Sequence, residues 1–596
     1  MLIQKLLFPN QDICLNRNLF YRFEKSTAYL FETRDSVQIH QYGSITSDTY
    51  FNCFSTEQWN YYTRLDNLSL RLFIKGWAVV KLLNSQIVNN SVKQTVLAVY
   101  EIQSTEKEWK TFTFPRIDYT GILYFSIESL SEESILFGGG YYSDVNETSL
   151  PEIDLSIAMC TFKRESYVKK NLSLLNKAVF ENERSPLYNH LKIYISDNGQ
   201  TLSSSLQSNK YIKIYSNKNA GGAGGFTRAF LEILHDPESP VSSHILVMDD
   251  DIIFSPEILL RIFIFVKMLK PKYKDAFIGS SFLNIDTPWM QVEFGGIVRN
   301  GYPIAKGTNR DLNKINILLQ NASINKLDYL GWWCCMIPMN FIKQELPLPL
   351  FFKRDDIEYC LRCKTEKILL NGIGVWHEPY LKKFSFSSIY YGQRNNLILD
   401  AIHSQKISEK ILLRELFATI KKNLLTYRYI DAELYLNAIS DYLKGIDWLK
   451  AIDPVELNKD IADMTPPVRP VREYGLEFVW NDYAKNTSFT ETRIQKWKRR
   501  LSLNGYFFKA KKFIIVPIYG PIIGTFWRAK KAFFFNAFNN TGFFENKSIK
   551  RAFNILFQTL KLRKEIKIKY KKVSTEYHAR FHELTSVQFW KQYLEL

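Results

Sequence analysis

The sequence of 596 residues predicts three regions: an N-terminal antiparallel β-sandwich at residues 1–150, an α/β region at 151–400, and a mainly helical region at 401–596. Three observations support this division. Short runs with strand-like alternation fill the first region, apolar strands alternate with helical stretches in the second, and long patterns of helical period fill the third. The length also exceeds what one hydrophobic core usually holds, so several domains are expected.

The first region consists of short runs of alternating apolar and polar residues, such as residues 69–74 and 111–114, separated by polar turns. Successive side chains of a strand point to opposite faces, so each run has one face for a core. This pattern is typical of an antiparallel sandwich. Carbohydrate-binding modules often have that shape, but a fold alone does not establish binding, and a scaffold role fits it equally well.

In the second region, apolar strands are expected at residues 155–160, 193–195 and 245–248. Helical stretches lie between the first two and after Gly225, which predicts a largely parallel sheet. All three strands run into polar residues. Ligands of such sheets bind beyond the carboxyl ends of the strands, so we expect a nucleotide across this edge.

The third of these strands ends in Asp249, Asp250 and Asp251. On a strand, Asp249 and Asp251 share one face and Asp250 points to the other. Two aligned carboxylates form a hard oxygen site, which suits Mg²⁺ or Mn²⁺ bound to the phosphates of a nucleotide. The alternative is an acidic turn before the helix start at residues 255–257. The triplet alone does not decide between the two, and its context favours the metal.

A glycine-rich segment at residues 217–228 opens a helix between the second and third strands. It contains Asn219, Gly221 and Gly222. Glycines let the backbone approach a ligand closely, and the free N–H groups of a helix N-terminus bind phosphate. The segment is neither a Walker A loop nor a dinucleotide fingerprint, and a merely flexible loop is the alternative.

Trp332 and Trp333 are adjacent and point in different directions if the chain is extended there. We therefore expect at least one of them in a cleft, where an aromatic face can stack on a sugar, although both can equally be core residues.

A second acidic pair, Asp355 and Asp356, opens a predicted helix that runs to about residue 370. A carboxylate at a cleft edge can accept the proton of an attacking hydroxyl, and helix capping is compatible with that role. His377 ends a later apolar segment. A lone histidine is more often structural, but here its ring nitrogen can complete the metal site.

The net charge of +18 lies almost entirely in the tail, because residues 491–596 hold 23 Lys and Arg against 6 Asp and Glu. Residues 513–527 are apolar but contain two prolines, so they are too short and broken to span a bilayer. We expect this segment in a membrane interface, with Phe533, Phe534 and Phe535 as further anchors. Packing onto the protein's own core is the alternative. Long apolar runs between the basic residues favour a membrane over a nucleic acid.

The chain contains no run of 18 apolar residues, and residues 1–20 lack the features of a signal peptide. We therefore expect a protein of the cytosol or of the cytoplasmic face of the cell membrane. The seven cysteines are scattered and do not suggest a disulfide framework. Cys360 and Cys363 form a C-x-x-C, but no second zinc pair follows, so buried thiols are expected.

These motifs in this order (C-T-F-x-R, D-N-G, N-x-G-G-x-G-G, D-D-D, G-W-W-x-C-M-I-P, D-D-x-x-Y-x-L-R and W-H) resemble the inverting, nucleotide-diphosphosugar-dependent glycosyltransferases of the GT-A fold. The sequence is most similar to the bacterial galactofuranosyltransferases that polymerise cell-wall galactan. The resemblance extends to residues 50–66 in the family's N-terminal sandwich and to residues 502–505 in its C-terminal region.

The resemblance implies a role for each matching residue. The nucleotide sugar would be held by Arg164, Asp197, Asn219, Gly221, Gly222, Asp249 and Asp250, and Mn²⁺ or Mg²⁺ by Asp249, Asp251 and His377. The acceptor and sugar would be contacted by Trp332, Trp333, Asp355 and Arg394, and Asp356 would be the catalytic base. One departure concerns Gly295 and Gly296, where the family has a glutamate after a glycine. The nearest carboxylate in this chain is Glu293.

By this resemblance the protein transfers galactofuranose, with inversion, from UDP-galactofuranose to a lipid-linked glycan acceptor in cell-surface polysaccharide synthesis. It would meet the inner membrane surface through its basic C-terminal region, and a homo-oligomer is compatible with it. Two alternatives stay open. One is a glycosyltransferase with another donor, such as dTDP-rhamnose. The other is a non-catalytic carbohydrate-binding scaffold, although the presence of Asp249, Asp251 and Asp356 argues against a degenerate site.

Overall fold

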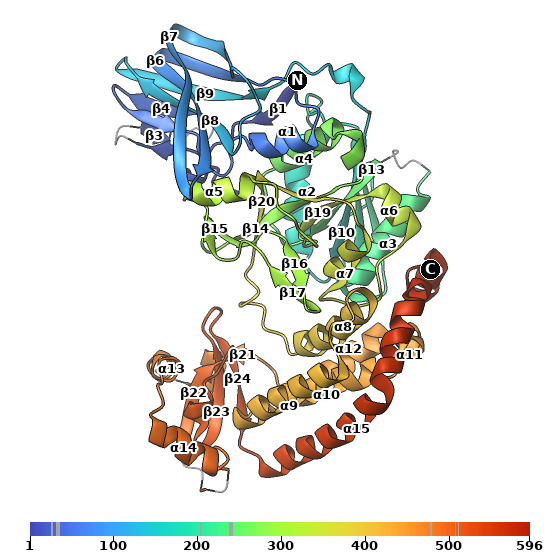
Figure 1. The fold of residues 1–596 in the computed structure, drawn as a ribbon. Coiled ribbons are helices and arrows are strands. Elements are labelled where there is room, and N and C mark those ends of the chain that lie inside the picture. The colour runs from blue at the N-terminus through green and yellow to red at the C-terminus, as the bar shows by residue number, and fades with distance from the viewer. Residues whose placement is uncertain are drawn as a thin grey trace.

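A computed structural model of the protein describes residues 1–24, 28–30, 36–202, 205–237, 242–476, 479–506, 508–509 and 512–596. Figure 1 shows a β-rich N-terminal part at one end of the molecule, an α/β part in the middle, and helices with a small sheet at the other end. The molecule is therefore a mixed α/β protein with a helix-rich C-terminal region, as the sequence predicts.

The N-terminal part is a nine-stranded sheet in which every pairing is antiparallel, as predicted. Its path runs β2-β5-β8-β6-β9-β4-β3, with β1 on β9 and β7 on β6. The long β6 pairs with β9 through its first half and with β8 through its second half, so the sheet folds over on itself around an apolar core. The elements are β1 (Leu2–Lys5), β2 (Arg22–Phe23), β3 (Ala28–Leu30), β4 (Val37–His40), β5 (Ser44–Thr46), α1 (Thr56–Tyr62), β6 (Ser69–Val88), β7 (Ser91–Thr113), β8 (Ile122–Ser129) and β9 (Glu133–Tyr142).

The middle part contains a second nine-stranded sheet, in the order β12-β11-β10-β13-β19-β14-β15-β18 with β20 on β14. The strands β10 to β13 are parallel, but β19 runs antiparallel between β13 and β14. The prediction of a largely parallel sheet thus holds for one half of it. The strands are β10 (Asp154–Thr161), β11 (Leu191–Asp197), β12 (Ile212–Ser216), β13 (Ser242–Asp249), β14 (Phe277–Asn284), β15 (Met290–Glu293), β18 (Arg310–Asp311), β19 (Cys334–Pro338) and β20 (Lys367–His377), and a separate pair is β16 (Gly296–Arg299) with β17 (Tyr302–Ala305).

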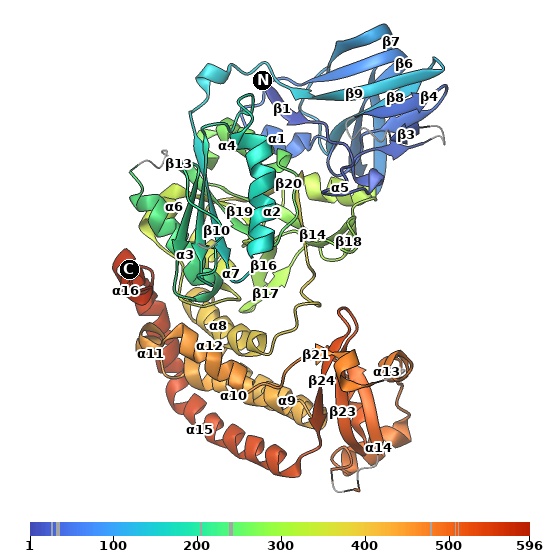
Figure 2. The ribbon, with the colours of Figure 1, turned by 180° about the vertical axis from the view of Figure 1, so that it is seen from behind.

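Helices cover both faces of this sheet (Figure 2). One face packs against α2 and α4, and the other against α3, α6 and α7. On the first face, Arg261 of α4 is buried and donates hydrogen bonds to the carbonyl oxygens of Lys5, Phe51 and Gly372, which ties the N-terminal part to the sheet. The helices are α2 (Glu165–Leu175), α3 (Gly221–His235), α4 (Glu257–Met268), α5 (Ile315–Ala322), α6 (Met339–Gln344) and α7 (Asp355–Arg362).

The helix predicted from residue 355 to about residue 370 is wrong in its length. α7 ends at Arg362, and the apolar residues that follow form β20. All of β20 is buried, and it runs parallel to β14. A short apolar run cannot be assigned to helix or strand by periodicity alone, and here its place in the sheet decides.

The C-terminal part is helix-rich, but it also contains a four-stranded sheet that the sequence did not predict. The order of this sheet is β21-β24-β23-β22. Its members are β21 (Arg469–Pro470), β22 (Lys512–Pro517), β23 (Ala529–Asn536) and β24 (Thr541–Asn546). The helices are α8 (Ser387–His403), α9 (Glu409–Leu425), α10 (Tyr429–Tyr442), α11 (Ile446–Ala451), α12 (Pro454–Asp463), α13 (Val479–Thr487), α14 (Arg493–Leu501), α15 (Ile549–Arg580) and α16 (Val587–Tyr593).

This sheet overturns the expectation that Phe533, Phe534 and Phe535 insert into a membrane. All three lie on β23 with exposed fractions of 0%, 0% and 1%. Phe534 stacks on Phe543, and the other two pack in a small core of their own. A run of aromatic residues suits a central strand that is buried on both faces, and these three residues occupy such a strand.

Among the described residues, no helix combines the length and apolar character needed to cross a bilayer.

Candidate active site

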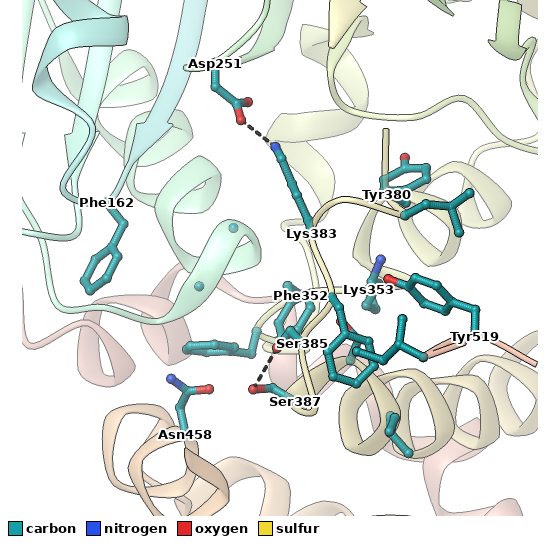
Figure 3. A pocket seen from close by; sticks show the side chains of 18 of the residues that line it. Phe162, Asp251, Phe352, Lys353, Tyr380, Lys383, Ser385, Ser387, Asn458 and Tyr519 are labelled. Carbon is teal, nitrogen blue, oxygen red and sulfur yellow. Dashed lines mark hydrogen bonds and ion pairs between the residues drawn. The ribbon is translucent and has the colours of Figure 1, made fainter. Parts of the chain in front are cut away.

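A cavity of about 990 Å³ lies beyond the carboxyl ends of β10 and β13, where the sequence predicts a nucleotide. The middle part contributes Arg164, the three aspartates, Gly221, Gly222 and His377 to its wall. The far wall comes from the C-terminal part, with residues such as Arg428 and Tyr519. Figure 3 shows Asp251 and Lys383 at one end of this cavity and Tyr519 at the other.

Asp249, Asp251 and His377 lie together, as predicted. One ligand atom from each lies within 4.8 Å of the others. His377 Nε2 is 3.0 Å from Asp251 Oδ1 and 3.7 Å from Asp249 Oδ2. The backbones of Ile253 and Trp376 exchange two hydrogen bonds, which brings the loop after the aspartates to the end of β20.

The orientation of His377 suits metal binding. Its Nδ1 lies 2.8 Å from the carbonyl oxygen of Glu378 and so carries the proton that it donates. Nε2 therefore faces the carboxylates as the ligand atom. Metal-binding histidines commonly donate their other ring N–H to a carbonyl oxygen in this way. Two carboxylates and an imidazole are a donor set that Mn²⁺ and Mg²⁺ accept. The residues present thus fit the predicted ion.

The pKa values of this cluster reflect burial and close charges. Burial raises the pKa of Asp249 to about 7. Burial opposes ionisation of Asp251 as well, but His377 and Lys383 together hold the pKa of this carboxyl well below its usual range. Burial lowers the pKa of His377, and the neighbouring Asp251 more than offsets this, so the pKa is raised overall. A cation is therefore favoured between these side chains, and a divalent ion would take that role.

Asp250 lies in the turn after β13, which ends at Asp249, so the predicted strand alternation does not set the direction of its side chain. Its Oδ2 accepts a hydrogen bond from Thr161 Oγ1 at 2.6 Å, and its Oδ1 lies 3.1 Å from Arg164 Nη1. The same Nη1 is 2.7 Å from Asp251 Oδ2. Asp250 thus holds Arg164 at the cavity wall and acts on the nucleotide site through this arginine.

The adjacent residues Asp197 and Asn198 have different surroundings in the structure. Asp197 is buried, and its carboxylate accepts hydrogen bonds from the backbone N–H groups of Gly199, Thr201 and Leu202, which shapes the loop after β11. Asn198 lines the cavity instead and donates to the carbonyl oxygen of Gly221. The residue of the D-N-G motif that faces the cavity is therefore Asn198, which the sequence analysis did not select.

The glycine-rich segment has its predicted place, with α3 beginning at Gly221 on the cavity wall. Asn219 also lines the cavity, and its Oδ1 accepts a hydrogen bond from the Gly221 N–H. Gly221 has φ +69°, and a Cβ there would lie 2.1 Å from the carbonyl oxygen of Phe351. The segment therefore needs glycine at this position for both conformation and close approach.

Gly221→Ala should lower the free energy of unfolding by more than about 1–2 kcal/mol, the usual penalty of a left-handed residue, because the contact with Phe351 adds to it. Gly222→Ala is the matched control, since a Cβ there would meet its nearest neighbour, Asp355 Oδ2, at 3.7 Å. Urea denaturation of the two variants measures the difference. Equal stability of both would contradict this account of the segment.

Asp355 and Asp356 open α7 opposite the glycine-rich segment. The residues before them are unusual, because Phe351, Lys353 and Arg354 all have φ near +70°. Non-glycine residues in this region are strained, and such strain is common where side chains are aimed at a functional site. The backbone thus turns sharply to place both carboxylates at the first turn of the helix.

Burial raises the pKa of Asp356. Burial and the charge of Asp356 raise the pKa of Asp355 to about 8. A carboxylate with a raised pKa is a better proton acceptor, and two such groups side by side share a proton readily. Glu293 belongs to the same cluster, because burial and Asp356 raise its pKa to about 8.

Trp332 and Trp333 point in different directions, as predicted, but both are buried, with exposed fractions of 5% and 6%. Trp332 packs edge-on against Phe226 and Tyr359. Trp333 donates its indole N–H to the carbonyl oxygen of Ser280 at 2.9 Å. The expectation of an indole exposed in a cleft is therefore wrong for this structure, because the core on each face of β19 takes one ring.

Arg394 is also buried, and it donates a hydrogen bond to the carbonyl oxygen of Leu350. Its neighbour Asn395 donates to the carbonyl oxygens of Leu350, Phe352 and Lys353. These two residues of α8 hold the strained segment that precedes Asp355. In this structure Arg394 acts on the site through the backbone, not through a position on the cavity wall.

Several cavity residues have no signal in the sequence. Lys383 lies 2.5 Å from Asp251, and Tyr380, Phe384 and Tyr519 provide aromatic wall. No motif marks them, because they belong to the loop after β20 and to the C-terminal part. Only the fold brings them to the cavity.

The predicted C-x-x-C thiols also have a clear place. Cys360 and Cys363 are buried and free, with Cys360 donating to the carbonyl oxygen of Leu330. The prediction of buried thiols is confirmed.

Comparisons with known proteins extend these observations. Residues 3–144 match the family model described as galactofuranosyltransferase 2 N-terminal. The galactofuranosyltransferase GlfT2 of Mycolicibacterium smegmatis is 26% identical over 475 residues, which cover 74% of this chain and 69% of the relative. The GlfT2 of Mycobacterium tuberculosis is 25% identical over 489 residues, which cover 76% of this chain and 74% of the relative.

Among solved structures, a mannosyltransferase from Pyrobaculum calidifontis in complex with GDP-Man and Mn²⁺ matches 53% of this chain and 81% of its own, with 9% identity and a TM-score of 0.28. A likeness this weak adds nothing to the argument. The relatives found by sequence are more informative. Over about three quarters of its length this chain is similar to galactofuranosyltransferases, which confirms the resemblance inferred from its motifs.

Proposed function

We propose that this protein is a metal-dependent inverting glycosyltransferase of the GT-A type that transfers galactofuranose from UDP-galactofuranose to a lipid-linked glycan. The observation that carries the proposal is the placement of two distinct acidic groups. Asp249, Asp251 and His377 form a metal-type cluster on one wall of the cavity, and Asp355 and Asp356 stand at the start of α7, with Asp355 next to Gly222. A nucleotide-sugar transferase needs both a site for the leaving diphosphate and a separate base.

In this mechanism the chain's own groups bind the donor and move one proton. Arg164 places a cation at the cavity wall beside the start of α3, and a guanidinium group suits a diphosphate. Asp356 accepts the proton of the acceptor hydroxyl as that oxygen attacks the anomeric carbon from the side opposite the diphosphate. The bound ion supplies the positive charge that stabilises the departing diphosphate.

The choice of donor rests on the relatives, whose names specify galactofuranosyl transfer. Product analysis by mass spectrometry tests it, with UDP-galactofuranose, a lipid-linked glycan acceptor, and either Mn²⁺ or EDTA. We expect an acceptor extended by hexose units with Mn²⁺ and none with EDTA. Product from dTDP-rhamnose but not from UDP-galactofuranose would support the alternative donor. Glycan binding without transfer from any donor would support the scaffold.

The basic C-terminal region is also part of the proposal, as the surface that meets an anionic membrane. The residues that serve this purpose differ from the predicted ones. On α14, Ile494, Trp497 and Leu501 occupy one face with exposed fractions of 68%, 64% and 79%. Exposed Lys496 and Lys498 lie beside them. An amphipathic helix with solvent-facing Trp and Leu and a cationic flank suits an interface with anionic lipid.

A second exposed stripe supports the same surface. On α15, Phe553, Phe557 and Leu560 have exposed fractions of 61%, 70% and 51%, and Lys561 and Lys564 follow them. The start of α15 and all of α14 lie at the end of the molecule remote from the N-terminal sheet (Figures 1 and 2). We propose that this end rests on the inner membrane surface, which would place a lipid-linked acceptor near the cavity.

The double substitution Trp497→Ser, Leu501→Ser should reduce binding to vesicles that contain phosphatidylglycerol by about tenfold or more, because it removes the largest apolar groups of α14. Co-sedimentation measures the bound fraction. Trp109→Ser is the matched control, since Trp109 is 55% exposed but lies on the N-terminal sheet. Equal losses in both variants, or wild-type binding to neutral phosphatidylcholine vesicles, would contradict the proposed surface.

A further inference from the structure

Lys383 has an unusual position for a lysine. Its Nζ lies 2.5 Å from Asp251 Oδ2 (Figure 3). It also lies 3.4 Å from His377 Nε2, so it contacts two of the three residues that fit a divalent ion. Its side chain is 28% exposed and lines the cavity. The ammonium group thus contacts the metal-type cluster on one side and the cavity on the other.

An ion and this ammonium group compete for the same carboxylate. An ion of this type binds carboxylate oxygen and imidazole nitrogen at about 2.0–2.2 Å, so it would lie within a few ångströms of Nζ. Two cations at that separation repel each other strongly in a partly buried site. The long, flexible lysine side chain can move away into the cavity, which begins at the same atoms.

The charges of the site indicate where the ammonium group then belongs. Asp249, Asp250 and Asp251 are three carboxylates, and the Arg and Lys side chains that pair with them are Arg164 and Lys383. A divalent ion and the diphosphate of a nucleotide sugar carry opposite charges of the same size, so their joint arrival adds no net charge. Without Lys383, the loaded site would hold one more uncompensated negative charge, which costs free energy in a partly buried cavity.

The loop that carries Lys383 is fixed from the C-terminal part. Asn536 of β23, which is fully buried, donates a hydrogen bond to the carbonyl oxygen of Leu381 at 3.0 Å. Asn539 donates to the carbonyl oxygen of Lys382 at 2.8 Å. Phe384 packs on Phe543 of β24. The backbone on both sides of Lys383 is therefore held in place, and the side chain is the part that can move.

We propose that Lys383 is a donor-binding residue. Its ammonium group holds Asp251 and His377 while no ion is bound and contacts the diphosphate of the nucleotide sugar when the ion is present. This inference rests on the proposed function, since it assumes a nucleotide diphosphate as ligand. It adds a residue that no motif predicts and gives the C-terminal sheet a role in donor binding.

Isothermal titration calorimetry of the full-length protein with UDP and Mn²⁺ tests the proposal. Lys383→Met should weaken UDP binding by about 10- to 100-fold, the usual effect of losing a charge-assisted contact, while the affinity for uridine, which lacks the diphosphate, stays within twofold. Without UDP, the same variant should bind Mn²⁺ more tightly than the wild type, because the competing cation is gone. Lys383→Arg should retain most of the UDP affinity.

Lys382→Met is the matched control, because the neighbouring Lys382 pairs with Asp286 at 2.7 Å, outside the cavity. It should bind UDP as the wild type does. UDP affinity within twofold of the wild type in Lys383→Met would overturn the inference, and so would equal losses for UDP and uridine, which would indicate a structural role. If the wild type itself binds no UDP with Mn²⁺, the proposed function fails, and this result is distinct from a failure of Lys383 alone.

Discussion

Asp356→Asn should lower the rate of sugar transfer by about 10²- to 10⁴-fold, the usual contribution of a positioned general base. Asparagine keeps the size of the side chain and can still accept the hydrogen bond from the Ile357 N–H. It cannot take a proton from the acceptor hydroxyl. UDP binding with Mn²⁺ should be unchanged, because Asp356 is not among the residues that line the cavity beside Arg164 and the glycine-rich segment.

Turnover of the sugar donor and calorimetric UDP affinity, measured on the same preparation, distinguish this role from a structural one. Asp286→Asn is a suitable control, since Asp286 is an exposed carboxylate that pairs with Lys382. Full transfer activity in Asp356→Asn would rule out Asp356 as the base. A parallel loss of UDP affinity would mean that the substitution disturbs α7 and the strained segment before it.

Asp251→Ala should abolish metal-dependent UDP binding. Loss of a residue that only orients a metal ligand typically lowers metal affinity by about 10- to 100-fold, and the loss of Mn²⁺ affinity here should be larger. Asp251 is the central carboxylate of the cluster, because it contacts His377, Lys383 and Arg164 at once. Its removal takes away one metal ligand, leaves Lys383 without its carboxylate partner, and leaves Arg164 with Asp250 alone. Both effects oppose the binding of another cation.

Electron paramagnetic resonance of free Mn²⁺ measures the bound fraction directly and does not depend on catalysis. Asp250→Asn is the informative comparison, because Asp250 positions Arg164 but is not one of the three residues of the cluster. It should retain Mn²⁺ binding and lose part of the UDP affinity. Wild-type Mn²⁺ affinity in Asp251→Ala, or equal Mn²⁺ losses in both variants, would contradict the assignment of the ligands.

The sequence predicts the metal-type cluster well because its geometry is local at each step. Apolar runs locate the strand ends, and the aspartates stand where β13 ends and in the turn that follows. The resemblance of the motifs to those of galactofuranosyltransferases then assigns the distant His377 to the same metal site as the aspartates. The same reasoning fails at the end of β11, where Asp197 shapes a loop and Asn198 faces the cavity. Within a polar turn, the directions of neighbouring side chains do not follow the regular period of a helix or a strand, so the sequence pattern does not predict them.

Other features depend on tertiary contacts that no local pattern contains. The aromatic run at Phe533–Phe535 is equally suited to a lipid interface and to a central strand, and only its pairing with β22 and β24 decides. The indole rings of Trp332 and Trp333 could stack on a sugar, but they are buried in the two hydrophobic cores on either side of β19. Lys383 is ordinary in sequence and becomes significant only because the end of β20 lies beside the loop that follows β13.

The cavity wall supplied by the C-terminal part has a consequence for how the chain can be divided. Arg428 and Tyr519 complete the cavity, and Asn536 holds the loop that carries Lys383. The α/β region is therefore not a self-sufficient catalytic module that could be excised near residue 400 or grafted onto another anchor. The cavity is formed jointly by the α/β region and the C-terminal part, so an insertion or a domain exchange is tolerable only where both of these walls are kept together.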